Sequence, residues 1–328
     1  MAEPEKILQY LKRCAHALAS RCRDISTQLR QGINSWLRQY GPVIREKTAL
    51  YVELTRFKRP IGSLLLLWPT LWALWIASNG SPGWHLFLVF LLGTILTRSA
   101  GCVMNDYADR DFDRFVERTQ TRPMTTGQVS HKEALFLALS LLFIAFLLVL
   151  TTNKLTVYLS FVAIPLSIIY PFLKRVTYLP QFVLGLAFSW GIPMAFAATG
   201  GSVPASAWLI FIANLLWVVV FDTIYAMVDR EYDLQVGMKS TAILFDDADK
   251  LIIGILQGLV LVVLVLTGNK FELPWVYFLF LGFASGFFIY QQYLIKDRKT
   301  DLCFKAFLNN NWFGATVFSG IALSYLLK

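Results

Sequence analysis

Two acidic segments of similar sequence are the part of this chain best suited to chemistry. Residues 109–113 read Asp-Arg-Asp-Phe-Asp, and residues 229–233 read Asp-Arg-Glu-Tyr-Asp. In each segment two aspartates stand one helical turn apart, so that in a helix they lie on one face. These four aspartates are Asp109, Asp113, Asp229 and Asp233. Two such faces brought together would supply the hard oxygen ligands with which Mg²⁺ holds a phosphate group, and we expect the four carboxylates to be catalytic.

The first acidic face extends back along the chain into apolar sequence. Asn105 precedes Asp109 by one helical turn and offers a neutral carbonyl oxygen as a metal ligand. It stands at the deepest position of this acidic face, where burial of a full charge would cost the most free energy. Arg98 stands two turns before Asn105 on the same face. A guanidinium inside an apolar helix needs an anionic partner, and Asp106, a diphosphate or a substrate carboxylate would each serve.

The second acidic face has the same organisation. Asp222 and Tyr225 lie on the helix face that carries Asp229, and Asp222 is placed most deeply in the apolar run. We predict that Asp222 and Tyr225 contact substrate. A simpler interpretation is that the first acidic segment is a solvated loop whose arginines pair with its carboxylates, and that Asp222 is a neutral, hydrogen-bonded residue inside a membrane helix. Two segments of one type, each directly after an apolar run, are harder to explain in that way.

Basic residues near the ends of other apolar runs complete the predicted site. Tyr170 and Lys174 close one run, and Arg56 precedes another. A diphosphate carries several negative charges, so Lys or Arg must bind the oxygens that the metal leaves and stabilise the leaving group. We expect Lys174 to serve catalysis, and Tyr170, Arg56 and Arg98 to bind substrate. Membrane orientation also places Lys and Arg at such helix ends, so the charges alone leave both roles open.

The elements that must position these residues are membrane helices. The chain has 328 residues, of which 56% are hydrophobic and 16% charged, and is too apolar for an ordinary soluble domain. Nine stretches approach the length of about 20 apolar residues that a helix needs to cross a bilayer. They are residues 61–78, 84–104, 132–151, 155–173, 180–199, 207–228, 250–267, 273–295 and 311–327. The predicted fold is all-α, an integral membrane bundle of about nine transmembrane helices.

The distribution of positive charge orients these helices. With a cytoplasmic N-terminus, the loops on the cytoplasmic side carry most of the 30 Lys and Arg residues, and the opposite side carries Lys154, Lys270 and Lys328. Positive cytoplasmic loops are typical of membrane proteins. Both acidic segments then face the cytoplasm, and an odd number of spans places Lys328 outside.

Residues 1–53 differ from residues 54–328, which hold all nine predicted spans. Apolar residues such as Leu11, Leu18 and Leu29 recur there at helical spacing, with Lys and Arg between them. This pattern predicts a basic amphipathic extension that lies on an anionic membrane surface. A transit peptide is the alternative, because the segment is rich in Arg and poor in acidic residues, but its few acidic residues and low serine content count against it.

Other function classes have less support. The net charge of +9 would suit a nucleic-acid partner, but its placement in alternate loops indicates membrane topology, and we predict no nucleic-acid binding. The four Cys and three His residues show neither metal-ligand nor disulfide spacing. The sequence also lacks the motifs of phosphate-binding loops, dinucleotide-binding folds and serine hydrolases, which leaves nucleotide-driven pumping and serine hydrolysis without support.

The motifs resemble those of a known family, the UbiA-type membrane prenyltransferases. Residues 105–113 match its N-D-x-x-D-x-x-x-D signature, residues 229–233 match its second D-x-x-x-D, and residues 170–174 resemble its Y-x-x-x-K element. Further stretches resemble the branch of the family that acts on 4-hydroxybenzoate; these are residues 56–62, 65–70, 222–230 and 239–245. The resemblance covers about residues 54–328 and leaves the N-terminal extension outside.

The resemblance implies a nine-helix fold in which the acidic motifs bind Mg²⁺ and a polyprenyl diphosphate beside a cavity facing the lipid. It also implies the reaction. Loss of diphosphate gives an allylic cation, the ring carbon ortho to the hydroxyl of 4-hydroxybenzoate captures it, and a proton leaves. The product, 3-polyprenyl-4-hydroxybenzoate, belongs to ubiquinone biosynthesis. The implied location is the bacterial inner membrane, with the active site on the cytoplasmic side.

Three alternatives remain open at this point. Another acceptor within the family, such as a naphthoate, homogentisate, haem or a glycerol phosphate, is disfavoured by the close local matches. A secondary transporter would use its intramembrane aspartates to carry protons or Na⁺, but those carboxylates would lie near the middle of the bilayer and not at one edge. A structural membrane anchor would leave the aspartates dispensable.

Overall fold

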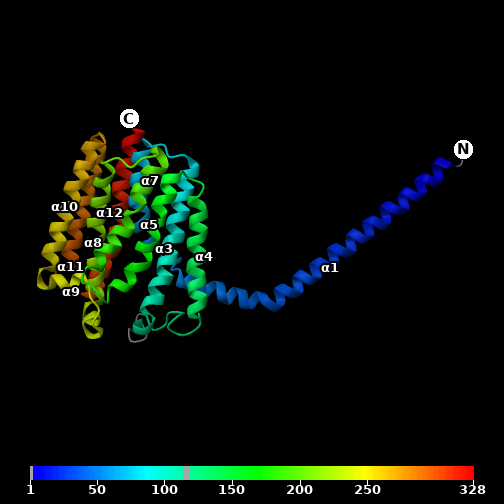
Figure 1. Cartoon of the computed structure of the whole chain (residues 1–328), viewed down its shortest axis with the longest axis horizontal. Helices are drawn as coiled ribbons and strands as arrows, with labels where there is room; N and C mark the ends of the chain where they lie inside the picture. The colour runs from blue at the N-terminus through cyan, green and yellow to red at the C-terminus, as the bar shows by residue number, and fades with distance from the viewer. Residues whose placement is uncertain (1–2, 114–118) are drawn as a thin grey trace. The chain divides into compact units, whose positions relative to one another are not determined.

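Every regular element in the described part of the chain is a helix, as predicted. The computed structural model describes residues 3–113 and 119–328, and leaves undescribed the side chains of 111–113 and of many residues in the range 3–37. The helices are α1 (Glu3–Leu54), α2 (Ile61–Ala77), α3 (Trp84–Asp113), α4 (His131–Val149), α5 (Lys154–Leu173), α6 (Pro180–Ser189), α7 (Gly191–Gly200), α8 (Ala207–Val236), α9 (Thr241–Phe245), the 3₁₀-helix Asp246–Ala248, α10 (Asp249–Lys270), α11 (Trp275–Ile295) and α12 (Thr300–Leu326) (Figure 1).

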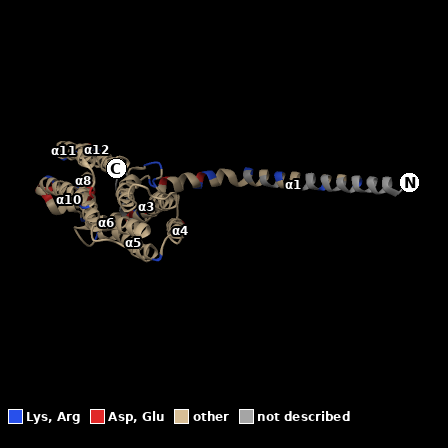
Figure 2. Ribbon diagram, turned by 90° about the horizontal axis from the view of Figure 1, so that it is seen from above, with Lys and Arg blue, Asp and Glu red and all other residues tan. Residues whose placement is uncertain are grey.

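The chain divides into two compact parts, Met1–Val52 and Glu53–Lys328. The first part is the helix α1, in which Trp36, Tyr40 and Val43 are exposed at helical spacing. The second part is the helical bundle, whose helices appear nearly end-on in Figure 2. The roles predicted for the two parts on either side of residue 53 remain predictions.

Seven helical stretches of the described chain are long and apolar enough to cross a membrane. Of the nine predicted spans, 61–78 corresponds to α2, which has only 17 residues, and 311–327 falls within α12, which is not among the seven. The last helix begins at Thr300, earlier than predicted, and its first half carries Asp301 and Lys305. The count of nine spans therefore stays a prediction, whereas the all-helical membrane fold is established.

The predicted span 180–199 is two helices that meet at Trp190. This residue ends α6 and begins α7. Pro193 follows within the first turn of α7, where its missing N–H needs no partner. Gly191 lies so close to α2 that a Cβ there would stand 2.8 Å from Oγ1 of Thr70. The junction therefore lets α7 pack closely against α2.

α8 lies at the centre of the bundle. Of its apolar stretch, 72% is buried inside the protein, whereas the figure for the peripheral helix α4 is 17%. Trp217 of α8 stacks on Trp72 of α2 with ring centroids 5.3 Å apart, and its indole nitrogen donates to Oδ1 of Asn310 on α12 over 2.9 Å. Helices in lipid associate through close packing and such interhelical hydrogen bonds, because burial of apolar surface drives association little there.

The two motif-bearing helices, α3 and α8, have 30 residues each. A helix of that length spans about 45 Å, whereas the hydrocarbon core of a bilayer is about 30 Å thick. Both helices therefore extend past the apolar region. Their acidic segments lie on these extensions, at the ends of continuous helices and not in loops.

Candidate active site

Asp106 of α3 is paired with two arginines. Its side chain is 4% exposed, and its Oδ1 lies 2.7 Å from Nη2 of Arg56 and 3.0 Å from Nη1 of Arg122. Burial lowers the pKa of Arg56, but the groups around it, Asp106 foremost, together raise it by more, so the guanidinium stays charged. Sequence reasoning had offered Asp106 as a partner for Arg98. The structure gives it to Arg56 and Arg122, and a substrate carboxylate at Arg56 would have to compete with this ion pair.

Asp109 and Lys174 join α3 to the end of α5. Nζ of Lys174 donates to Oδ2 of Asp109 over 3.2 Å. Burial lowers the pKa of Lys174, but Asp109, Tyr170 and Asp222 together raise it by more, so the pKa is raised and the amine stays protonated. The other carboxylate oxygen, Oδ1 of Asp109, is buried and has no hydrogen-bond partner among the described residues. Such an oxygen is costly unless a ligand brings it positive charge or a donor, so it fits a metal ion or a bound substrate.

Asp222 of α8 and Tyr170 of α5 meet beside the Asp109 pair. The Tyr170 hydroxyl donates to Oδ2 of Asp222 over 3.2 Å. Asp222 also interacts electrostatically with Lys174 and Arg98. Residues from α3, α5 and α8 that are far apart in the sequence therefore gather in one polar cluster, which we call the Asp109 cluster: Arg98, Asp109, Tyr170, Lys174 and Asp222.

Arg98 lies deeper along α3 than the carboxylates of the acidic segment. Its guanidinium packs against the backbone of α2, where a Cβ added to Gly62 would stand 2.6 Å from Nη2. On another side it lies 5.9 Å from the ring centroid of Phe188. Its Nε is buried, and no group in the described part of the chain accepts a hydrogen bond from it. A buried N–H donor without an acceptor is rare, and here it offers a binding position for an anionic group.

The remaining predicted residues of α8 lie further along the helix. Asp229 and Asp233 are half-buried on the turns that follow Asp222. Tyr225 packs its ring 4.8 Å from that of Phe307 on α12. These placements follow the predicted stripe along α8.

The predicted metal ligands of α3 are only partly visible. Asn105 is half-buried one turn before Asp109, and Asp113 is the last residue of α3 with its side chain outside the described residues. Among the side chains that the structure describes, no three carboxylates, histidines or cysteines are grouped closely enough to hold a metal ion by themselves. The oxygens of α3 and α8 could then share a metal only together with the phosphate oxygens of a substrate.

Comparison with known families identifies the bundle. The model of the UbiA prenyltransferase family matches residues 66–315, most of the chain. The chain belongs to the UbiA prenyltransferase family. It is 56% identical over 281 residues to a 4-hydroxybenzoate octaprenyltransferase of Aliivibrio fischeri. The matched region covers 86% of this chain and 99% of the relative. It is 54% identical over 278 residues to the enzyme of that name in Pseudomonas aeruginosa, with 85% and 94% covered.

Solved structures of UbiA proteins share the fold. A UbiA homologue from Aeropyrum pernix superposes with a TM-score of 0.71 at 22% identity and covers 79% of this chain and 97% of its own. A UbiA homologue from Archaeoglobus fulgidus, determined bound to GPP and Mg²⁺, superposes with a TM-score of 0.63 at 17% identity, with 83% and 99% covered. The helical bundle of this chain therefore has the same fold as the solved UbiA structures.

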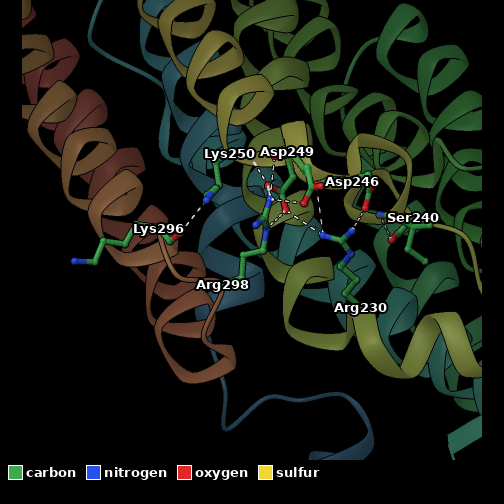
Figure 3. Close-up of polar contacts among 9 residues, drawn as sticks. Arg230, Ser240, Asp246, Asp249, Lys250, Lys296 and Arg298 are labelled. Carbon is green, nitrogen blue, oxygen red and sulfur yellow. Dashed lines mark hydrogen bonds and ion pairs between the residues drawn. The ribbon is translucent and has the colours of Figure 1, made fainter.

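This UbiA protein also carries a second ionic cluster, centred on a buried aspartate, that sequence reasoning missed (Figure 3). Asp249, the first residue of α10, is fully buried and accepts hydrogen bonds from Arg298 at 2.8 and 2.9 Å. Arg230 of α8 lies 3.4 Å from the same carboxylate and pairs with Asp246. The spacing of these residues gave no signal. The only available hint was that one arginine of the second acidic motif would need a partner of its own.

Proposed function

We propose that this protein transfers a polyprenyl group from polyprenyl diphosphate to the ring of 4-hydroxybenzoate, ortho to its hydroxyl, and so forms 3-polyprenyl-4-hydroxybenzoate for ubiquinone biosynthesis. The observation that carries the proposal is the identity of 56% and 54% to 4-hydroxybenzoate octaprenyltransferases over 99% and 94% of their lengths. The Asp109 cluster supports it, because a protonated lysine beside a partly unpartnered carboxylate suits a metal-bound diphosphate.

The proposed cofactor is Mg²⁺. The unpartnered Oδ1 of Asp109 and the carboxylate character of both acidic faces fit a hard divalent cation. The proposed ligands are Asn105, Asp109, Asp113, Asp229 and Asp233. The bound ion would neutralise charge on the diphosphate and make it a better leaving group.

The other residues of the site have separate proposed roles in the reaction. Protonated Lys174 donates an N–H to a diphosphate oxygen as the allylic C–O bond breaks, and stabilises the charge that develops there. The ring carbon of the acceptor then forms a C–C bond with the allylic carbon, and the ring proton leaves to restore aromaticity. Tyr170 and Tyr225 offer aromatic faces to the positive charge, and Asp222 fixes the hydroxyl of Tyr170.

Arg98 is the proposed partner of the acceptor carboxylate. A benzoate in a site of low dielectric needs a fixed cation, because an unpaired buried charge costs several kcal/mol. Arg56 already has Asp106 at 2.7 Å, whereas Nε of Arg98 is buried without an acceptor. The choice between the two arginines that the sequence left open therefore favours Arg98.

The proposed orientation has the N-terminus and both acidic segments on the cytoplasmic side of the bacterial inner membrane, with nine spans. The N-terminal extension is proposed to lie on the anionic membrane surface. In a cysteine-free background, an impermeant thiol reagent added from outside should label Lys328→Cys and spare Val176→Cys, a position that is 70% exposed in the native protein. The reverse labelling pattern would refute the orientation.

The reaction itself is tested with membranes that contain the protein, Mg²⁺, a polyprenyl diphosphate and labelled 4-hydroxybenzoate. The expected result is a lipid-soluble labelled product that EDTA abolishes. Labelled homogentisate and a naphthoate serve as competing acceptors. Product from either of these and none from 4-hydroxybenzoate would assign a different acceptor, and no product from any acceptor would contradict prenyl transfer.

A further inference from the structure

The end of α8 that carries Asp229 and Asp233 is held by two arginines and two aspartates outside the Asp109 cluster. We call this group the clamp: Arg230, Asp246, Asp249 and Arg298. It joins three segments of the chain, because Arg230 belongs to α8, the aspartates to the 3₁₀-helix and the start of α10, and Arg298 to the loop between α11 and α12 (Figure 3).

Asp249 is the centre of the clamp. Nε of Arg298 lies 3.2 and 2.9 Å from the two oxygens of Asp249, and Nη2 lies 2.8 Å from Oδ1. Nη1 of Arg230 approaches Oδ2 at 3.4 Å, and the backbone N–H of Lys250 donates to Oδ1 at 2.6 Å. Both oxygens are satisfied, so the fully buried carboxylate has no capacity left for a ligand.

The backbone of the clamp is held in unusual conformations. Asp246 and Arg298 have φ angles of 46° and 53°. Residues with a β-carbon seldom adopt this left-handed region, and such conformations persist only where surrounding contacts fix them. Nη2 of Arg298 supplies one such contact, because it donates to the carbonyl oxygen of Asp247 over 2.9 Å.

Helix geometry connects the clamp to the second acidic face. Successive residues of an α-helix are about 100° apart around its axis. While the guanidinium of Arg230 is held by Asp246 and Asp249, the neighbouring Asp229 must therefore point to a different side of α8. Rotation of the α8 end would move Asp229 and Asp233 together, because they lie one turn apart on one face.

The segment between α8 and α10 makes two further contacts, one with the end of α5 and one with α8. The backbone N–H of Lys239 donates to the carbonyl oxygen of Lys174, a residue of the Asp109 cluster, over 2.8 Å. Oγ1 of Thr241 lies 2.6 Å from Oγ1 of Thr223, the residue after Asp222. The clamp aspartates stand at the other end of this segment. A short, hydrogen-bonded stretch of backbone therefore connects the clamp to the Asp109 cluster.

We propose that Asp249 and Arg298 are positioning residues for the second acidic motif: through Arg230 they fix the rotation of the α8 end, so that Asp229 and Asp233 face the metal–diphosphate unit. The inference rests on the proposed function, in which these two aspartates are metal ligands. Outer contacts that orient metal ligands typically change metal affinity by about 10–100-fold when they are removed.

The test measures metal binding directly in the purified full-length protein. Mn²⁺ replaces Mg²⁺, inorganic diphosphate is the probe ligand, and the EPR signal of free Mn²⁺ gives the affinity. Arg298→Lys keeps the positive charge but loses the bidentate contact with Asp249. Asp249→Asn keeps the shape of the side chain but loses its negative charge. Both variants should bind Mn²⁺ with diphosphate about 10-fold or more weakly.

Lys250→Met is the matched control. Lys250 lies at the same helix junction, but its side chain donates to the carbonyl oxygen of Lys296 at the end of α11 over 2.9 Å and so connects α10 with α11. It should leave Mn²⁺ affinity unchanged. In turnover assays, the clamp variants should raise the KM for polyprenyl diphosphate and the Mg²⁺ requirement several-fold, with the KM for 4-hydroxybenzoate unchanged.

A purely structural role predicts a different pattern. If Arg298→Lys lowers the unfolding temperature but binds Mn²⁺ with diphosphate as tightly as the natural protein, the positioning role is wrong. Equal changes in both KM values would also contradict it. Should Asp249→Asn fail to fold, Arg298→Lys and Arg230→Lys decide the question, since both retain the positive charge.

Asp229→Asn separates the two proposals. If Asp229→Asn leaves Mn²⁺ affinity unchanged, the metal assignment of the proposed function fails. If Asp229→Asn weakens Mn²⁺ binding and Asp249→Asn does not, only the clamp inference fails. When both weaken it, the double variant should lose less affinity than the two single losses combined, because Asp249 acts partly through the orientation of Asp229 and partly through that of Asp233.

Discussion

Asp109 and Asp249 are both buried aspartates paired with basic residues, yet they differ in what their oxygens still lack. Asp249 accepts from Arg298, Arg230 and a backbone N–H, and both of its oxygens are satisfied. Asp109 accepts from Lys174, and its Oδ1 has no hydrogen-bond partner among the described residues. We call Asp249 a closed carboxylate, because its partners satisfy both oxygens, and such a group stabilises the native arrangement. Asp109 is an open carboxylate, because its Oδ1 lacks a partner among the described residues, and such a group is matched to a ligand that the protein must bind.

Replacing the open carboxylate should give the largest effect on turnover. Asp109→Asn removes the charge that faces the metal–diphosphate unit, and we expect kcat to fall by about 10²–10³-fold, in the range found for lost transition-state charge stabilisation. Steady-state assays in saturating Mg²⁺ measure it. The protein should still insert into the membrane, with only the modest fall in unfolding temperature that follows from loss of the Lys174 ion pair. Full activity of Asp109→Asn would show that the open oxygen has no catalytic role.

Replacing the closed carboxylate should affect stability most. Asp249→Asn leaves two guanidiniums short of a charged partner, and breaking a buried ion pair costs about 3 kcal/mol. The unfolding temperature in detergent should fall further for Asp249→Asn, which loses the partner of two arginines, than for Asp109→Asn, which loses the partner of one lysine. Equal falls for the two variants would remove the distinction between an open and a closed carboxylate.

Arg98→Leu should separate acceptor binding from diphosphate binding. Loss of one partner of a buried charge pair costs about 2 kcal/mol or more, which corresponds to a roughly 30-fold rise in the KM for 4-hydroxybenzoate. The KM for polyprenyl diphosphate should change little. Arg56→Leu is the comparison, since Arg56 is held by Asp106. A rise in only the diphosphate KM would assign Arg98 to the leaving group.

Gly62→Ala should give the smallest effect. The added Cβ would stand 2.6 Å from Nη2 and 2.8 Å from Nε of Arg98, so the guanidinium must shift. Because it is the end of a flexible side chain, we expect a rise of only about 2–5-fold in the KM for 4-hydroxybenzoate, below about 1 kcal/mol. Gly93→Ala on α3, where an added Cβ meets nothing within 4 Å, is the control. Identical kinetics for the two variants would argue against carboxylate binding at Arg98.

Much of the fold was predictable because its signals are local. Apolar length located α3, α4, α5, α8, α10 and α11 to within a few residues, apart from the polar extensions of α3 and α8, and one-turn spacing placed Asp109 and Asp222 on helix faces. The break at Trp190 and the early start of α12 were missed. A break inside an apolar run and a helix that continues into polar sequence both leave hydrophobicity nearly unchanged, so composition does not reveal them.

The sequence by itself determined which residues lie on one helix face and at which end of a helix they stand, because a repeat of 3.6 residues per turn is a property of neighbouring positions. Only the tertiary structure decided the partners. Asp106 pairs with Arg56 rather than Arg98, and Asp249 with Arg298, across separate helices and loops. Such pairs depend on how the helices pack against one another, and that packing set which carboxylate is closed and which retains an open oxygen.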